Sequence, residues 1–358
     1  DVAVYEINEN YRNPDLPHFQ TVVVKGGGDS ASAARSVLET GEYDYAWNIQ
    51  IAPEVLASMA ASGKGEVLTG FGTSLEHIVF NTTDPSSSLP EGERATAKHP
   101  HPILNDIRVR QALSMAIDRE LLVEIGYGET GKATCNYINA PEIYASDWSG
   151  CMEQDIEGAR ALLDEAGWEV GPDGVRVKDG KRLSLLYQTT INSVRQDFQA
   201  LIKQWWQEIG VETELKAIDA GVYFGGDAGS PDTYQKFYAD VEMYASSFLG
   251  ADPEHFLAQR TCNKAPGPEN QWQGENINRF CDADYDALVK ELGRTADLEA
   301  RGEISRKLND MLTRDSHWIL PLVYRGSISG RLLTLEGIGK RNSWDSPLWN
   351  IAEWYRAK

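Results

Sequence analysis

A glycine-rich turn near the N-terminus is the first segment whose spacing could support chemistry. Gly26, Gly28 and Ala31 fit the pattern G-x-G-x-x-A between an expected strand and an expected helix, which is the form of a dinucleotide-binding loop. Asp29 would place a carboxylate where the pyrophosphate should sit, and no acidic residue follows at the distance that a ribose contact needs. The turn is better explained as a flexible link between strand and helix, and no cofactor is expected.

Histidines and loop carboxylates are the other candidates for chemistry. His99 and His101 flank a proline and could be part of a metal site. No third ligand lies near them in the sequence, so solvated side chains are the better interpretation and no metal is expected. Two carboxylates could also serve a glycoside hydrolase, but nothing singles out a pair, and turn or helix-cap roles explain most of them. The loop carboxylates are Asp84, Asp147, Asp219, Asp227 and Asp252.

The chain is rich in aromatic side chains that could line a binding cleft, with 10 Trp and 15 Tyr. Several stand at the ends of expected strands or in loops, where a ring offers an apolar face and one polar atom. Sugars, aromatic groups and peptide planes can all stack on such rings, and local core packing is the alternative for each of them. These residues are Trp47, Tyr223, Tyr244, Trp272, Trp344 and Trp349.

The elements that must position these residues alternate between strand and helix, which predicts an α/β fold. The clearest unit is a strand over 183–188, an apolar helical stripe from Val194 to Ile209 and a strand over 211–217, which predicts two parallel strands joined by a helix. Asp106, Asp118 and Asp155 are placed to cap three further helices. Other expected strands are 2–5, 21–24, 43–47, 76–81, 241–248 and 318–324, and other expected helices are 30–40, 283–293 and 298–314.

Composition and charge exclude several classes of function. A length of 358 residues fits two domains or one large bilobal unit. The formal net charge of -20 repels phosphate backbones and anionic lipid surfaces, so no nucleic-acid partner is expected. The longest apolar run, 318–324, is too short to span a membrane. The chain opens with neither Met nor the pattern of a signal peptide, so we expect a processed product or part of a longer chain.

The four cysteines indicate the compartment. Cys135 and Cys151 bracket one loop, and Cys262 and Cys281 bracket another, which favours two local disulfides among the three connectivities that four cysteines allow. Four unrelated buried thiols are the alternative, and the close ligand pairs that zinc requires are absent from the sequence. Two disulfides would place the protein in an oxidising compartment outside the cytoplasm.

Several stretches, taken in order along the chain, resemble the substrate-binding proteins of bacterial ABC importers for peptides, nickel and opines (family 5), which form the large three-lobed class. Residues 41–47 resemble the family's G-E-x-D-x-A element, and residues 102–113 followed by 116–119 resemble its most specific signature. Further matching stretches are 77–81, 164–168, 252–257 and 319–322.

The resemblance implies a bilobal α/β fold of the periplasmic-binding-protein type, whose lobes close about a hinge. The first lobe is expected to comprise residues 1–95 and 326–358, and the second residues 96–325. The hinge is expected near 82–102 and again near 322–330. The N-terminal part of the family pattern, which completes the first lobe and forms another, is missing from this sequence.

The resemblance also implies capture rather than catalysis. The protein is expected to be a periplasmic monomer that is not an enzyme and that delivers a small polar solute to the membrane permease of an ABC importer. Peptide-binding members anchor the peptide amine with a Trp-x-x-Asp element, and the matching positions here are Ser246 and Leu249. An ordinary peptide is therefore disfavoured, and an opine, an oligosaccharide or another polar solute is favoured.

Residues at the ends of strands that face the cleft are expected to contact this solute. The aromatic rings would stack, and the hydroxyl and amide groups would form hydrogen bonds. A secreted glycan-active hydrolase that uses two loop carboxylates is the alternative from a different class, and a chaperone-like peptide binder would share the fold. The expected ligand-binding residues are Trp47, Asn48, Tyr223, Tyr244, Ser246, Ser247, Phe248 and Trp272.

Overall fold

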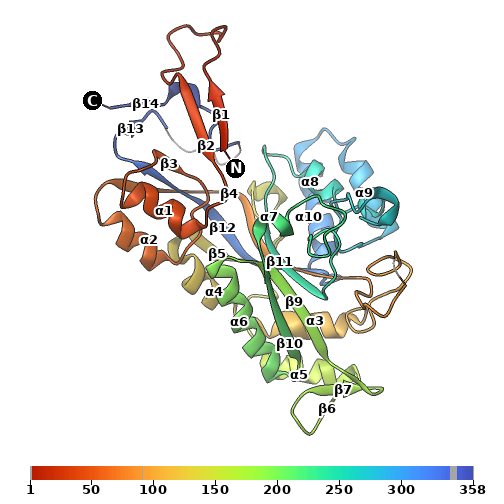
Figure 1. Cartoon of the computed structure of the whole chain (residues 1–358). Coiled ribbons are helices and arrows are strands. Elements are labelled where there is room, and N and C mark those ends of the chain that lie inside the picture. The colour runs from red at the N-terminus through yellow and green to blue at the C-terminus, as the bar shows by residue number, and fades with distance from the viewer. Residues whose placement is uncertain (1, 91, 339–344, 358) are drawn as a thin grey trace.

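A seven-stranded mixed sheet forms the centre of the molecule (Figure 1). The computed structural model describes residues 2–90, 92–338 and 345–357. The three strands at one side of the sheet are parallel, whereas the next two are antiparallel to their neighbours. In spatial order the strands are β10 (Glu212–Ile218), β9 (Ser184–Thr190), β11 (Val241–Ser246), β4 (Gly65–Phe80), β12 (Ile319–Leu332) and β3 (Tyr45–Ala46), with β5 (Gly131–Ala133) also paired to β12.

The expected strand–helix–strand unit is confirmed by β9, α6 (Ser193–Glu208) and β10. Asn192 caps the helix, because its side chain accepts a hydrogen bond from the Arg195 backbone N–H at 3.1 Å. The helix ends before Gly210, which adopts a φ of 86° that a glycine tolerates without strain. Its apolar stripe lies in the main core, where the buried Trp206 donates to the Leu113 carbonyl at 3.0 Å. The α/β prediction is therefore confirmed.

Aspartates begin most of the remaining helices. Asp106, Asp118 and Asp155 each accept a backbone N–H of the first turn, as expected. The same residue type begins the two helices near the C-terminus. The helices are α1 (Ser30–Leu38), α2 (Pro53–Ala60), α3 (Ile107–Met115), α4 (Arg119–Gly126), α5 (Ile156–Glu165), α7 (Ala220–Tyr223), α8 (Glu254–Ala258), α9 (Ala283–Leu292) and α10 (Leu298–Leu312).

Two long strands, β4 and β12, connect the two lobes of the molecule. One end of the β4–β12 pair, with β4 residues 65–71, lies beside α1 and α2, and the other end, with β4 residues 75–80, lies between β12 and β11. Both strands are longer than expected. The first half of β4 holds three glycines and no apolar alternation, so its pairing with β12 rather than its own pattern makes it a strand. The hinge and lobe boundaries predicted above stay predictions.

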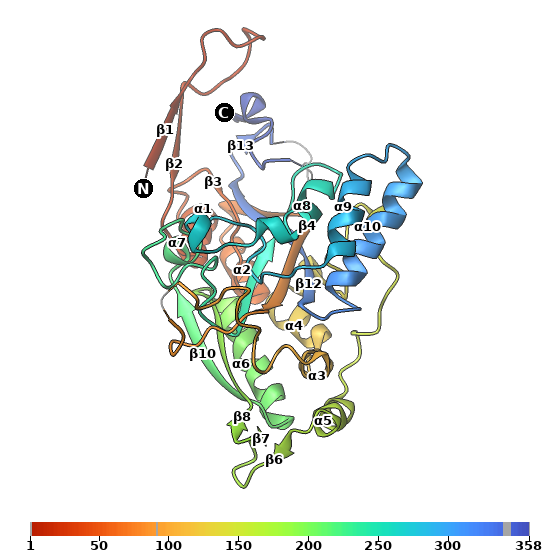
Figure 2. The same ribbon diagram turned by 90° about the vertical axis from the view of Figure 1, so that its right-hand side faces the viewer.

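Small antiparallel ribbons and two disulfides complete the fold. Figures 1 and 2 show β1 (Val2–Glu6) and β2 (Thr21–Lys25) projecting beyond the rest of the molecule, near β13 (Leu335–Glu336) and β14 (Tyr355–Arg356). A third ribbon comprises β6 (Glu169–Val170), β7 (Arg176–Lys178) and β8 (Lys181–Arg182). The predicted cysteine pairing is confirmed, since both pairs lie at bonding distance, 2.07 Å and 2.14 Å between sulfurs.

Candidate functional site

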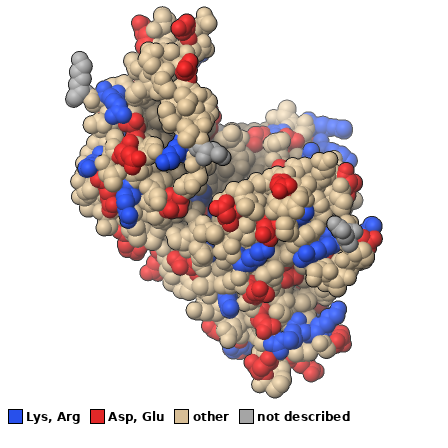
Figure 3. Space-filling model, in the orientation of Figure 1, with Lys and Arg blue, Asp and Glu red and all other residues tan. Residues whose placement is uncertain are grey.

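The carboxyl ends of the parallel strands β9, β10 and β11 meet at one edge of the sheet. In open α/β sheets, ligands bind outside this edge. Exposed apolar side chains follow each strand there, and Leu249 after β11 is 73% exposed. Figure 3 shows the surface hollowed between the part built around α1 and the part built around α8 to α10. The exposed apolar side chains that follow strands are Trp47, Ile191, Val222, Phe224 and Leu249.

Trp47 and Asn48 follow β3 and belong to the predicted first lobe. Trp47 is 64% exposed, which leaves its ring available for stacking. Asn48 has a φ of 52°. Its side-chain oxygen accepts a hydrogen bond from Arg325 Nη2 of β12 at 3.1 Å. The two residues thus lie where the first lobe meets the strands that join the lobes.

Ser246, Ser247 and Phe248 form the end of β11 and the segment after it. Thr73 of β4 holds this segment, because its hydroxyl accepts from the Phe248 N–H at 3.0 Å and donates to the Phe248 carbonyl at 2.6 Å. The Phe248 ring stacks on Phe256 at 5.3 Å between centroids. The sequence reasoning did not select Thr73, although it fixes Phe248 relative to the long strand.

The remaining predicted residues, Tyr223, Tyr244 and Trp272, are buried. Tyr223 and Tyr244 lie in one aromatic cluster, which is bridged by Phe224 and Tyr234 at centroid distances of 4.9–6.4 Å. Trp272 lies outside it and packs edge-on against Tyr238 at 5.7 Å. Their contact with a solute stays a prediction. Trp344 lies outside the described residues.

A buried ionic network centred on Glu76 of β4 lies at the lobe junction. Arg195 of α6 donates to both carboxylate oxygens, at 2.9 and 3.1 Å. The Tyr127 hydroxyl donates to the same carboxylate at 3.0 Å, and the Gln50 amide donates at 3.2 Å and also reaches the Tyr127 hydroxyl. Arg325 Nε lies 3.7 Å from Glu76 Oε1. One carboxylate therefore joins residues from the loop after β3, from the end of α4, from α6 and from both long strands.

Electrostatics keep this carboxylate charged although it is completely buried. Burial alone would raise the pKa of Glu76, but the charges of Arg195 and Arg325 and the hydrogen bonds from Arg195 and Tyr127 lower that pKa to about 2. The neighbouring His77 is uncharged at neutral pH, because burial, with Arg260 nearby, lowers its pKa to about 3. Glu242 of β11 behaves oppositely, since burial raises the pKa of its carboxyl well above the usual value.

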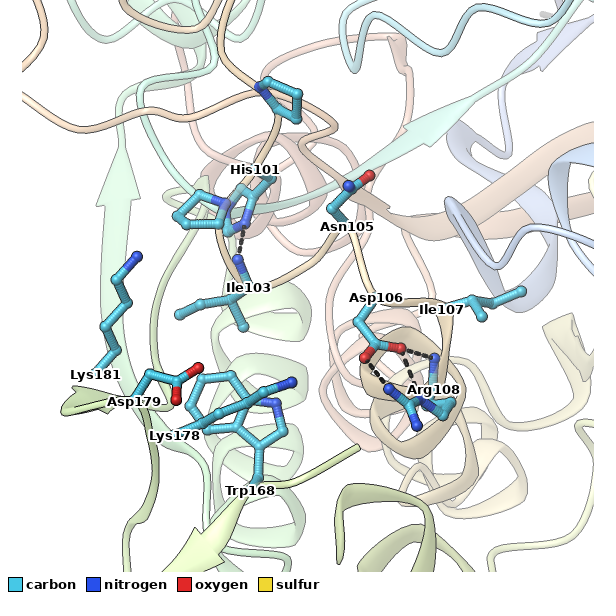
Figure 4. A pocket seen from close by; sticks show the side chains of 12 residues that line it. His101, Ile103, Asn105, Asp106, Ile107, Arg108, Trp168, Lys178, Asp179 and Lys181 are labelled. Carbon is cyan, nitrogen blue, oxygen red and sulfur yellow. Dashed lines mark hydrogen bonds and ion pairs between the residues drawn. The ribbon is translucent and has the colours of Figure 1, made fainter. Parts of the chain in front are cut away.

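A pocket of about 770 Å³ lies in a different part of the second lobe. Figure 4 shows its wall of the 100–108 segment, Trp168 and the β7–β8 turn. Three of its charged groups are already engaged: Asp106 pairs with Arg108 at 2.6 Å, and Lys178 donates to the Ala166 carbonyl at 2.7 Å. The predicted solute contacts lie elsewhere. The described residues contain no cluster of three or more His, Cys, Asp or Glu arranged to hold a metal ion.

Comparison with known proteins decides the family. The family model of the bacterial extracellular solute-binding proteins, family 5 (middle), matches residues 1–265. The chain belongs to this family. It is 23% identical over 310 residues to "Di/tripeptide-binding protein 3" of Pseudomonas aeruginosa (strain UCBPP-PA14), which covers 85% of this chain and 50% of that protein. It is 23% identical over 366 residues to "Oligopeptide-binding protein AppA" of Bacillus subtilis (strain 168), with 99% and 59% covered.

Solved structures share the fold of this family 5 chain. NikZ from Campylobacter jejuni in complex with Ni(L-His) superposes with a TM-score of 0.81 at 20% identity, over 99% of this chain and 65% of that one. The oligopeptide binding protein from Thermus thermophilus, complexed with a pentapeptide, gives 0.80 at 22% identity, over 99% and 60%. The bilobal fold expected from the sequence is therefore confirmed. The chain spans about half the length of the first curated relative, and 59% of AppA.

The comparisons give no support to the hydrolase alternative, because the relatives named above are binding proteins. No helix among the described residues is long and apolar enough to cross a membrane.

The ionic network was missed by the sequence reasoning, although two signals point to it. Glu76 is a charged residue at the start of the expected strand 76–81, directly before the apolar residues of that strand, and Arg325 directly follows the longest apolar run. Charged residues are rarely fully buried unless they are paired, so each predicts a partner. The partners themselves, Gln50 and Arg195, lie far away in sequence and carry no such signal.

Proposed function

We propose that this chain is part of a periplasmic solute-binding protein that captures a small polar solute between its two lobes and presents it to the membrane permease of an ABC importer. The solute is an opine, an oligosaccharide or a peptide-like molecule, and no covalent bond in it changes. The protein acts as a monomer. A solute shifts the open–closed equilibrium only by its differential affinity for the two states, so contacts from both lobes are required.

The observation that supports this proposal is that Asn48 and Phe248 are both hydrogen-bonded to the β4–β12 pair, close to where its register shifts. Asn48, which belongs to the predicted first lobe, accepts from Arg325 of β12, and Phe248, which belongs to the predicted second lobe, is held on β4 by Thr73. Leu249 stands where peptide-binding members carry an acidic residue, which favours a solute without a cationic amine.

Trp47→Ala is expected to weaken solute binding about 10-fold or more, since a stacked aromatic contact contributes roughly 1–2 kcal/mol. A thermal-shift screen of peptides, opines and oligosaccharides identifies a solute, and calorimetry gives its affinity. Trp47 is mostly exposed, so the substitution leaves the core intact. Trp148→Ala is the matched control, because Trp148 packs on His317 ahead of β12, at 6.0 Å between centroids. Equal affinities of the Trp47 variant and the unmodified chain would remove Trp47 from the site.

Turnover separates capture from catalysis. The purified chain is incubated with labelled oligosaccharides and the products are analysed. Binding without product is expected, and accumulation of cleaved glycan would instead support a hydrolase.

A further inference from the structure

The segment that follows β11 is held by a side chain instead of by strand pairing. The pairing of β11 with β4 ends where Ser246 lies opposite Leu75. Two positions further along, the buried Thr73 hydroxyl of β4 accepts from the Phe248 N–H at 3.0 Å and donates to the Phe248 carbonyl at 2.6 Å. One hydroxyl therefore binds both backbone groups of Phe248, as an opposite strand residue would.

The side chains on either side of Ser247 face one aromatic pair. The Phe248 ring stacks on Phe256, and the Phe256 ring stacks on Tyr137 at 4.8 Å between centroids. The Ser246 side chain is a hydrogen-bonding neighbour of the same Tyr137. Successive side chains of an extended segment point to opposite faces, so Ser247 faces the other side of the sheet.

That other side of the sheet carries contacts from the predicted first lobe. Ala245, two positions before Ser247, lies opposite Glu76 in the β11–β4 pair, so Ser247 lies on the same face of the sheet as Glu76. Gln50, two positions after the predicted contact Asn48, donates to the Glu76 carboxylate at 3.2 Å. Ser247 is also exposed, so its hydroxyl can reach a solute on this face.

We propose that Thr73 is a positioning residue, which holds Ser247 so that the serine hydroxyl forms a hydrogen bond with the solute. This inference rests on the proposed function. It gives Ser247 the contact with the solute, whereas Ser246 and Phe248 anchor the segment on the aromatic pair. Because β11 ends at Ser246, the two bonds of Thr73 keep Ser247 on the Glu76 face. Hydrogen bonds weaken steeply with distance and angle, so a small shift of Ser247 would lose the contact.

The test measures the affinity of variants of the full chain by calorimetry. The probes are octopine, maltotriose and the dipeptide Gly-Phe, one from each proposed class of solute. Thr73→Val removes the hydroxyl and keeps the shape, and it should weaken the best-bound probe about 3- to 10-fold, the effect of one lost hydrogen bond. Ser247→Ala should weaken it by a similar factor. Thr73→Ser keeps the hydroxyl and should bind within about 2-fold of the unmodified chain.

The double variant separates positioning from a general loss of stability. If Thr73 acts through Ser247, Thr73→Val has already displaced the serine hydroxyl, so adding Ser247→Ala should weaken binding by less than about 2-fold more. Thr213→Val is the matched control. Thr213 is a buried threonine of β10 in the same sheet, and its hydroxyl has no hydrogen-bond partner among the described residues. Its replacement should leave the affinity unchanged.

A second readout needs no solute. Amide hydrogen exchange at Phe248 should be about 10-fold or more faster in Thr73→Val than in Thr73→Ser or Thr213→Val. Equal exchange in these variants, or losses of affinity that multiply in the double variant, would overturn the inference and leave solute capture standing. Failure of the unmodified chain to bind any probe, with exchange as expected, would contradict the proposed function and reduce Thr73 to a structural contact.

Discussion

Replacing Glu76 by Gln is the sharpest test of how the two lobes are held together. The substitution keeps the shape of the side chain and removes its charge. Arg195 and Arg325 would then both remain buried without a counter-charge. The hydrogen bonds that Arg195 and Tyr127 donate would weaken, because a neutral amide oxygen is a poorer acceptor than a carboxylate.

The expected loss follows from the burial of the pair. Glu76 has no exposed surface, and removing one partner of a buried ion pair destabilises a protein by about 3–5 kcal/mol. A large chain loses roughly 2 °C of melting temperature per kcal/mol. Glu76→Gln should therefore melt roughly 6–10 °C below the unmodified chain.

Glu66→Gln provides a control on the same strand. Glu66 also pairs with an arginine of β12, Arg331, but its side chain is 44% exposed. An exposed pair contributes about 0–1 kcal/mol, so this variant should melt within about 2 °C of the unmodified chain. Both are measured by differential scanning fluorimetry at pH 7.5. Equal changes in melting temperature for Glu76→Gln and Glu66→Gln would refute the argument that burial makes the Glu76 ion pairs more stabilising than an exposed pair.

Three further predictions concern other parts of the molecule. Replacing Cys262 and Cys281 by Ser should destabilise the chain by about 3 kcal/mol, the entropy of the open loop, measured by urea unfolding; an unchanged unfolding midpoint would contradict this. The pKa of His77 is about 3 in the folded chain against 6.5 for a free histidine, so the unfolded chain takes up a proton first and stability falls as the pH drops from 6.5 towards 3. His77→Gln should reduce this fall by up to about 1.4 kcal/mol per pH unit, measured by urea unfolding at several pH values. An equally steep fall in the variant would rule His77 out as a cause. Gly126→Ala should lower the unfolding free energy by about 1–3 kcal/mol, because its Cβ would lie 2.6 Å from the Phe198 ring, whereas Gly28→Ala meets nothing within 4 Å and should be neutral; similar losses in both would show that close packing at Gly126 is not the cause.

Much of the fold was predictable because local signals agreed with the final structure. Each capping aspartate precedes an apolar helical pattern, and the stripe of α6 lies between two strands with short connections. The disulfides were predictable because each pair of cysteines brackets one loop. In these cases the information lies within about twenty residues of sequence.

The candidate site was predictable only in part, because its geometry depends on distant contacts. Trp47 and Ser246 stand at strand ends, which the sequence shows. The hold of Thr73 on Phe248 and of Arg195 on Glu76 spans 175 and 119 positions, so no local pattern reveals it. The first half of β4 was not predicted as a strand for the same reason, because its glycine-containing segment forms a strand only through pairing with β12.

The continuity of β4 and β12 across the junction limits how the lobes can move. The two strands stay hydrogen-bonded to each other from one lobe into the other, with register shifts at Pro321/Val323 and Tyr324/Gly326. Any motion of the two lobes relative to each other must therefore bend this paired ribbon, because no flexible linker replaces it at the β4–β12 connection. A paired ribbon resists sideways shear, so a bend in it would keep the two ends in the same alignment.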